Sequence, residues 1–289
     1  MLGLAEAGKR RLAYGFWRYG EADLEAAATM LSLARESGID HLDTGDVYGG
    51  SRGFGGSERM LGALRQRAPS LFSGATIATK AGCEPGSPYN SSAAYLKAAC
   101  DGSLSRLKVE RIDLFYIHRP DLLTHPHEVA EALDSLVASG KVAAIGVSNF
   151  TVDQVLALLR YLRTPIAVHQ IEFSAAHVNP LFDGTLDQAM ERDNAVAAWS
   201  PMAGGRLGID GPAEFVAVRE ALTTIGAKHG ASPAAVAIAF LHMHPAPVTP
   251  ILGTKTPARL REALTASAII LSRAEWYAIV EAARGAPMP

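Results

Sequence analysis

Short apolar runs alternate with longer amphipathic runs along the whole chain. The longer runs place apolar residues at positions i, i+3, i+4 and i+7, which is the spacing of one helix face. The short runs are apolar on both faces, as strands buried within a parallel sheet are. Eight short runs predict strands, at 11–17, 39–44, 75–80, 112–118, 142–148, 166–173, 195–200 and 248–253.

The intervening runs predict helices with recognisable ends. In 22–38, Leu24, Ala27, Ala28 and Leu31 would share one face, and Gly38 follows as a C-cap. Two helices are expected in 213–243, and a last one in 272–284. The other helices are expected to begin near Ser57, Ser91, His127, Val152 and Leu186, and Ser232-Pro233 supplies an N-cap and a proline at N1.

Eight strand–helix units without a break in composition predict a (β/α)8 barrel, with 1–289 in a single domain. A doubly wound open sheet is the alternative, but such sheets usually have fewer strands. No Pro/Ser-rich linker or low-complexity segment interrupts the rhythm.

Composition excludes several classes of partner. The formal net charge is −2 and no basic run stands out, so neither nucleic acid nor an anionic membrane is an expected partner. No stretch approaches the ~20 apolar residues of a membrane span, and the start of the chain lacks the pattern of a signal peptide. Cys83 and Cys100 form no CxxC pair, so no metal site is expected. We expect a cytoplasmic monomer.

Polar residues stand where three consecutive predicted strands end. Asp43, Lys80 and His118 close these strands, and Tyr48 lies in the loop that leaves the first of them. Neighbouring strands lie about 4.8 Å apart, and barrel enzymes carry their chemistry at this end. The four side chains are therefore expected around one small pocket.

The four residue types suit acid–base work on an oxygen atom. A phenol with a pKa near ~10 is a proton donor at neutral pH, and a nearby ammonium such as that of Lys80 lowers that pKa. Asp43 would neutralise the buried Lys80, and His118 would hold a substrate oxygen. Taken singly, each residue also has an ordinary structural role. Asp46, the competing acid, is interpreted as a turn-forming residue.

The motifs around these residues resemble those of the aldo-keto reductases, which are NADPH-dependent carbonyl reductases on a (β/α)8 barrel. The family's motifs are matched in order along nearly the whole chain, by DTGDVYG (43–49), TK (79–80), DLFYIH (113–118), GK through GVSNF (140–150) and QIE (170–172). GFWRYG, IHRPD (117–121) and WSPMAGGRL (199–207) look most like the YdhF-type bacterial branch.

The resemblance implies a role for each matched residue. Tyr48 would be the general acid, Lys80 and Asp43 would tune it, and His118 would orient the carbonyl. Ser148, Asn149 and Gln170 would bind the nicotinamide carboxamide. Trp199 replaces the tyrosine that usually stacks on the nicotinamide, and Ser200 follows it.

The adenine end of the cofactor would bind after the last strand. Thr256-Pro257 opens a predicted helix there, and Lys255 and Arg259 suit the 2′-phosphate of NADP better than the bare ribose of NAD. NADPH is therefore expected, and NADH is less favoured. Ala263 replaces an asparagine of the family. The residues expected to hold this end are Gly253, Thr254, Lys255, Thr256, Arg259 and Glu262.

The predicted activity is NADPH-dependent reduction of an aldehyde or ketone. Trp17 would form a wall of the substrate pocket, with a core aromatic as the alternative, and the short segment after the last helix predicts an open mouth. One alternative function is a non-enzymatic NADPH-binding regulator resembling potassium-channel β subunits, although the complete set of four residues speaks against it. A lyase that uses Lys80 as a Schiff base is the other.

Overall fold

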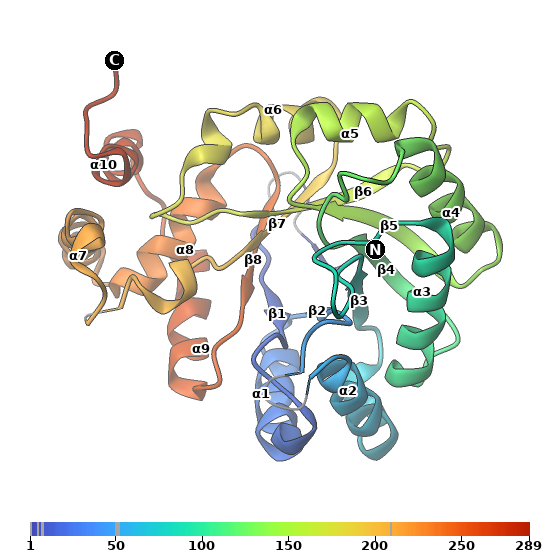
Figure 1. Ribbon diagram of the computed structural model, residues 1–289. Helices are drawn as coiled ribbons and strands as arrows, with labels where there is room; N and C mark the ends of the chain where they lie inside the picture. Colours follow the sequence, from blue (N-terminus) through green and yellow to red (C-terminus); the bar gives the residue numbers. More distant parts are fainter. Residues whose placement is uncertain (1, 5, 7–8, 50–52, 209) are drawn as a thin grey trace. The chain divides into compact units, whose positions relative to one another are not determined.

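The eight strands follow one another in chain order around a closed parallel barrel, which confirms the predicted (β/α)8 fold (Figure 1). The computed structural model describes residues 2–4, 6, 9–49, 53–208 and 210–289. Each predicted strand is present, with ends that differ by a few residues. The strands are β1 Ala13–Gly15, β2 His41–Asp43, β3 Thr76–Ala81, β4 Ile112–Ile117, β5 Val142–Ser148, β6 Ile166–Glu172, β7 Ala195–Trp199 and β8 Val248–Leu252.

The chain divides into two compact units. The first comprises Met1–Gly3 and Ala13–Gln170, and the second comprises Leu4–Leu12 and Ile171–Pro289. A single domain over 1–289 stays a prediction. In the first unit, the helices pack against one another in chain order, as the blue-to-green part of Figure 1 shows. These helices are α1 Leu24–Glu36, α2 Gly56–Arg67, α3 Ala93–Leu107, α4 Pro126–Ala138 and α5 Val152–Leu159.

Side-chain caps fix several helix ends in this unit. The Ser92 hydroxyl accepts a hydrogen bond from the Tyr95 amide at the start of α3, and Thr151 and Gln154 form a reciprocal capping box at α5. Such caps typically contribute about 1 kcal/mol each. Gly38 has a φ of 77° and donates its amide to Arg35, as expected of a residue that ends α1.

The strand register in this unit places the polar residues on one face. Lys80 of β3 pairs with Tyr116 of β4, and side chains at paired positions lie on the same face of a sheet. Gly146 of β5 pairs with Tyr116 in turn. A Cβ at Gly146 would lie 2.5 Å from the Tyr116 ring, so only glycine leaves room for that ring.

The second unit is built around α8, a helix that is apolar except for His242 in its last turn. Every residue from Ala235 to Leu241 is buried, because α7, α9 and β8 pack around it. The Ser232 hydroxyl caps α8, as predicted. Thr256 is the N-cap residue of α9 and a proline follows it, also as predicted, although the Thr256 side chain makes no capping hydrogen bond. The helices are α6 Thr185–Glu191, α7 Val216–His229, α8 Pro233–Met243, α9 Pro257–Leu264 and α10 Arg273–Arg284.

Candidate active site

The four residues expected to share a pocket do come together in the first unit. Asp43 ends β2, Lys80 lies near the end of β3, His118 follows β4, and Tyr48 lies in the loop after β2. The loop brings Tyr48 back over the strand ends through a tight turn, in which the Tyr48 amide donates to the Gly45 carbonyl at 3.1 Å.

Lys80 and Asp43 form a buried ion pair. The Lys80 side chain is 0% exposed, and its Nζ lies 2.6 Å from Asp43 Oδ1 and 2.7 Å from the Thr44 carbonyl oxygen. Burial by itself lowers the pKa of Lys80, but Asp43 and Tyr48 outweigh it, so that the pKa is raised. The ammonium therefore stays charged at neutral pH, which speaks against the Schiff-base alternative because that chemistry needs a neutral amine.

Tyr48 and His118 face each other through their polar atoms. The Tyr48 hydroxyl lies 3.2 Å from His118 Nε2, and Lys80 Nζ lies 5.0 Å from the centre of the Tyr48 ring. Burial, with Lys80 and Arg119 adding to it, lowers the pKa of His118 to about 3. His118 is thus a neutral imidazole, which can donate one hydrogen bond and accept another.

The prediction that Tyr48 has a lowered pKa is wrong, although the predicted effect of Lys80 is present. Lys80 does lower the pKa of Tyr48, but burial raises it by more, and Asp43 adds to the increase. The phenol is therefore protonated throughout the neutral range. This is the state that a proton donor needs.

Three amide and hydroxyl side chains lie at the ends of β5 and β6 in the same unit. Asn149 has a φ of 59°, a conformation that asparagine tolerates, and its Nδ2 donates to Ser148 Oγ at 2.8 Å and to the His118 carbonyl at 3.2 Å. The Gln170 backbone carbonyl accepts the Asn149 backbone amide at 3.0 Å, and the Gln170 side-chain Nε2 donates to Asp43 Oδ2 at 2.8 Å. This set of donors and acceptors fits a planar carboxamide.

Comparison with known proteins shows the family to which the chain belongs. The model of the Aldo/keto reductase family matches residues 11–284. The chain belongs to the aldo/keto reductase family. Its members are oxidoreductases that act on carbonyl compounds and typically bind a nicotinamide cofactor.

Individual aldo/keto reductases match nearly end to end. A 6-dehydroglucose reductase from Novosphingobium aromaticivorans is 44% identical over 96% of this chain and 93% of its own. The oxidoreductase YdhF of Escherichia coli is 33% identical over 96% and 95%, which confirms the likeness to that branch. The solved glycerol dehydrogenase of Gluconobacter oxydans is 26% identical with a TM-score of 0.83, covering 99% of this chain and 96% of that one.

Trp17 lies two residues after β1 and is 49% exposed. The alternative that it is a core aromatic is therefore wrong. The Arg18 guanidinium lies 4.6 Å from the centre of its ring. A role in a substrate pocket stays a prediction.

The other residues expected to hold the cofactor of this aldo/keto reductase lie in the second unit. Trp199 ends β7, and Ser200 follows it with a φ of 50°. The Thr256 amide donates to Thr254 Oγ1 at 3.1 Å in the loop after β8. Of the remaining predicted residues, Gly253 and Glu262 are half-buried, whereas Lys255 and Arg259 are exposed.

The sequence analysis did not predict a buried cluster of charged residues formed by Asp46 after β2, Glu58 of α2 and Arg106 of α3. Asp46 does lie in a turn, as predicted, but its side chain is fully buried, and neither carboxyl oxygen accepts a hydrogen bond from any described residue. Glu58 of α2, also fully buried, bonds to Thr79 Oγ1 at 2.5 Å and Arg106 Nε at 2.6 Å. Burial first, and then Glu58, raise the pKa of Asp46 to about 8.

Tyr116 was also missed as a neighbour of the site. It is fully buried, and Lys80 Nζ lies 5.8 Å from the centre of its ring. A period of two counted back from His118 puts Tyr116 on the same face, so the sequence did carry a signal for it.

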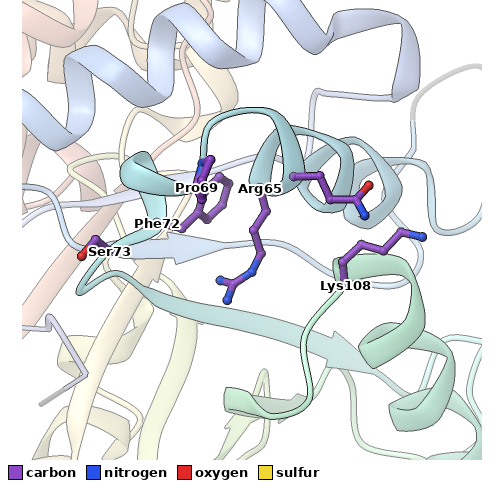
Figure 2. A pocket seen from close by; sticks show the side chains of 6 residues that line it. Arg65, Pro69, Phe72, Ser73 and Lys108 are labelled. Atoms are coloured by element: carbon purple, nitrogen blue, oxygen red, sulfur yellow. The ribbon is translucent and has the colours of Figure 1, made fainter.

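A separate hollow of about 280 Å³ lies in the first unit and includes none of the four pocket residues. Figure 2 shows the side chains of Arg65, Phe72 and Lys108 among those that line it. Arg65 lies in the last turn of α2, and Lys108 is the C-cap of α3. Cations at these positions stabilise helix ends, which accounts for both without a ligand.

No helix within the described part of the chain is long and apolar enough to cross a membrane. Among the same residues, no three His, Cys, Asp or Glu side chains gather as metal ligands would. His125 instead caps α4, its Nδ1 accepting the amide of His127 at 3.1 Å.

Proposed function

We propose that this protein reduces an aldehyde to an alcohol with NADPH, and that Tyr48 is the general acid. The observation that carries the proposal is the Tyr48 hydroxyl at 3.2 Å from a neutral His118, beside the buried Lys80–Asp43 pair. Two groups that can donate hydrogen bonds to a substrate oxygen, together with one fixed positive charge, thus lie at the ends of three neighbouring strands.

Each of the four side chains has a distinct part in the reaction. The bound cofactor supplies the hydride. Tyr48 and the Nε2–H of His118 donate hydrogen bonds to the carbonyl oxygen and so fix its position. Tyr48 then gives its proton to that oxygen, and Lys80, held by Asp43, stabilises the phenolate that remains. Ser148, Asn149 and Gln170 would hold the carboxamide of the nicotinamide.

The pH dependence of reduction follows from the state of Tyr48. Because burial raises its pKa, the proton donor is fully present at neutral pH and is lost as the pH rises through that pKa. Reduction should therefore be flat through the neutral range and decline only on the alkaline side. The reverse oxidation, which starts from the phenolate, should rise there.

The favoured substrate class is a hexose that carries its aldehyde at carbon 6. Similarity at 44% identity to a 6-dehydroglucose reductase supports this choice. The Trp17 indole, after β1, is half exposed, and the face that the Arg18 guanidinium does not cover is the kind of flat apolar surface on which a sugar ring can pack. NADPH, rather than NADH, is proposed because Lys255 and Arg259 are exposed near the start of α9 and can meet a 2′-phosphate.

The test is Tyr48→Phe, assayed by NADPH consumption with 6-dehydroglucose, an aromatic aldehyde and a simple ketone. Loss of a positioned acid typically reduces turnover by about 10²- to 10⁴-fold, while NADPH binding, followed by fluorescence titration, should change little. The matched control is Tyr95→Phe, because the Tyr95 hydroxyl bonds to the Cys83 carbonyl at 3.0 Å instead of facing His118. That variant should keep wild-type turnover.

Each component of the proposal can fail separately. Normal turnover by Tyr48→Phe would show that another group is the acid. Equal rates with NADH and NADPH would remove the assigned role of Lys255 and Arg259. Binding of NADPH without consumption of it, with every aldehyde in the panel, would instead favour the regulator.

A further inference from the structure

The side chain of Gln170 is held in one orientation by the ion pair beside it. Its Nε2 lies 2.8 Å from Asp43 Oδ2, while the other oxygen of the same carboxylate, Oδ1, lies 2.6 Å from Lys80 Nζ. An ionised carboxylate can only accept hydrogen bonds, so the NH₂ group of the amide must face Asp43. The amide oxygen, Oε1, is consequently turned away from it.

The surroundings leave this amide little freedom to rotate. Gln170 is 2% exposed and Asp43 is 5% exposed, and buried polar groups are costly when their bonds are broken. The Tyr116 ring packs against Gly146, and its hydroxyl lies close enough to the Gln170 amide for that amide to lower the pKa of Tyr116, although burial raises this pKa by more. None of the hydrogen bonds found among the described residues ends on Oε1. That oxygen therefore remains an acceptor for a ligand N–H.

We propose that Gln170 is a positioning residue, oriented by Asp43, and that the two hydrogen bonds of the Asp43 carboxylate join the carboxamide site to Lys80, the cation beside Tyr48. Asp43 thereby has two tasks, because one oxygen holds the cation that serves Tyr48 and the other orients the residue that receives the cofactor. The inference rests on the proposed function, since it takes the ligand of Oε1 to be the carboxamide NH₂ of NADPH.

A double-mutant cycle on NADPH affinity tests this coupling without measuring turnover. Gln170→Met keeps the length of the side chain but removes both polar atoms, and it should weaken NADPH binding about tenfold, as the loss of one well-placed hydrogen bond does. An asparagine at position 43 can present either its oxygen or its NH₂, so it no longer dictates the orientation of Gln170. In the Asp43→Asn background, the same Gln170→Met change should cost about threefold or less.

The matched control is Ser148→Ala, which alters the same carboxamide site but not the contact with Asp43. Ser148 Oγ bonds to Asn149 Nδ2 at 2.8 Å, so its removal should weaken binding by the same factor in both backgrounds. If Asp43→Asn fails to fold because Lys80 is left unpaired, the neutral pair Asp43→Asn with Lys80→Met provides the second background. Thermal unfolding establishes which background to use.

The outcomes separate this inference from the proposed function. Equal losses for Gln170→Met with and without Asp43 would overturn the orienting role, even if Tyr48→Phe were inactive as expected. A wild-type protein that does not bind NADPH would overturn the proposed function, and the present inference with it. Non-additivity confined to Gln170 is the expected result.

Discussion

Replacing Asp46 by asparagine should stabilise the protein relative to the wild type by an amount that grows as the pH rises. Asp46 is fully buried and receives no hydrogen bond from the described residues, whereas its neighbour Glu58 has both Arg106 and Thr79. Burial, followed by the charge of Glu58, raises the pKa of Asp46 from its ordinary 3.8 to about 8. Asparagine has nearly the same shape and cannot ionise.

The sign and size of the effect follow from the difference in proton binding. The folded protein holds the Asp46 proton more tightly than the unfolded chain, so stability is greatest below the unfolded pKa and is lost as the pH rises towards about 8. Each pKa unit corresponds to about 1.4 kcal/mol. Between pH 5 and pH 8, the wild type should therefore lose about 4 kcal/mol that the Asp46→Asn variant keeps.

Urea unfolding of both proteins at pH 5, 6, 7 and 8 measures this difference. A buried amide without partners can cost about 1–3 kcal/mol at every pH, so the slope of the difference, and not its absolute value, is the quantity to compare. Asp121→Asn is the control. Although burial raises the pKa of Asp121, bonds from Thr124, Ser91 and Leu123 outweigh it and lower the pKa. Both the folded and the unfolded states are then ionised throughout pH 5–8, so this variant should lose the same amount of stability at every pH of the series. Parallel curves for wild type and Asp46→Asn would refute the reasoning.

Two further substitutions probe the packing around the site. Gly146→Ala should cost about 1–3 kcal/mol in urea unfolding, because the new Cβ would lie 2.5 Å from the Tyr116 ring and 2.9 Å from the Val168 carbonyl oxygen. Wild-type stability of that variant would mean that the ring is not held there. Arg106→Met should lower the free energy of unfolding by about 3–5 kcal/mol, because it leaves Glu58 buried with only Thr79 as a partner. Adding Glu58→Gln should recover much of that loss. A double variant no more stable than Arg106→Met alone would contradict this account.

The fold was predictable because its signals are local and repeated. Each strand is an apolar run, and a period of 3.6 marks the helices between them, so β1 to β8 could all be located. Their ends were less exact. The predicted first strand covered 11–17 but the observed one is Ala13–Gly15, because the residues beyond it leave the hydrogen-bonded ladder without any change in apolar character.

Strand ends and motifs predicted which residues form the candidate site, but not their pKa values or all of their hydrogen bonds. The sequence predicted that Asp43, Tyr48, Lys80 and His118 lie around one pocket. The structure joins them in two hydrogen-bonded pairs, Tyr48 with His118 and Lys80 with Asp43, and places Lys80 Nζ 5.0 Å from the centre of the Tyr48 ring. The net pKa of Tyr48 was not predictable, because it depends on how deeply the ring is buried and not on which residues are near it. The bond from Gln170 to Asp43 joins residues 127 positions apart and had no signal in either motif.

The complete burial of Lys80 also determines which chemistry in the cell can reach it. Acetyltransferases and amine-directed labels need an uncharged nitrogen that they can contact from outside, whereas this one is enclosed and held as a cation by Asp43. The folded enzyme should therefore keep this lysine unmodified when exposed lysines such as Lys255 react. Its labelling would report unfolding.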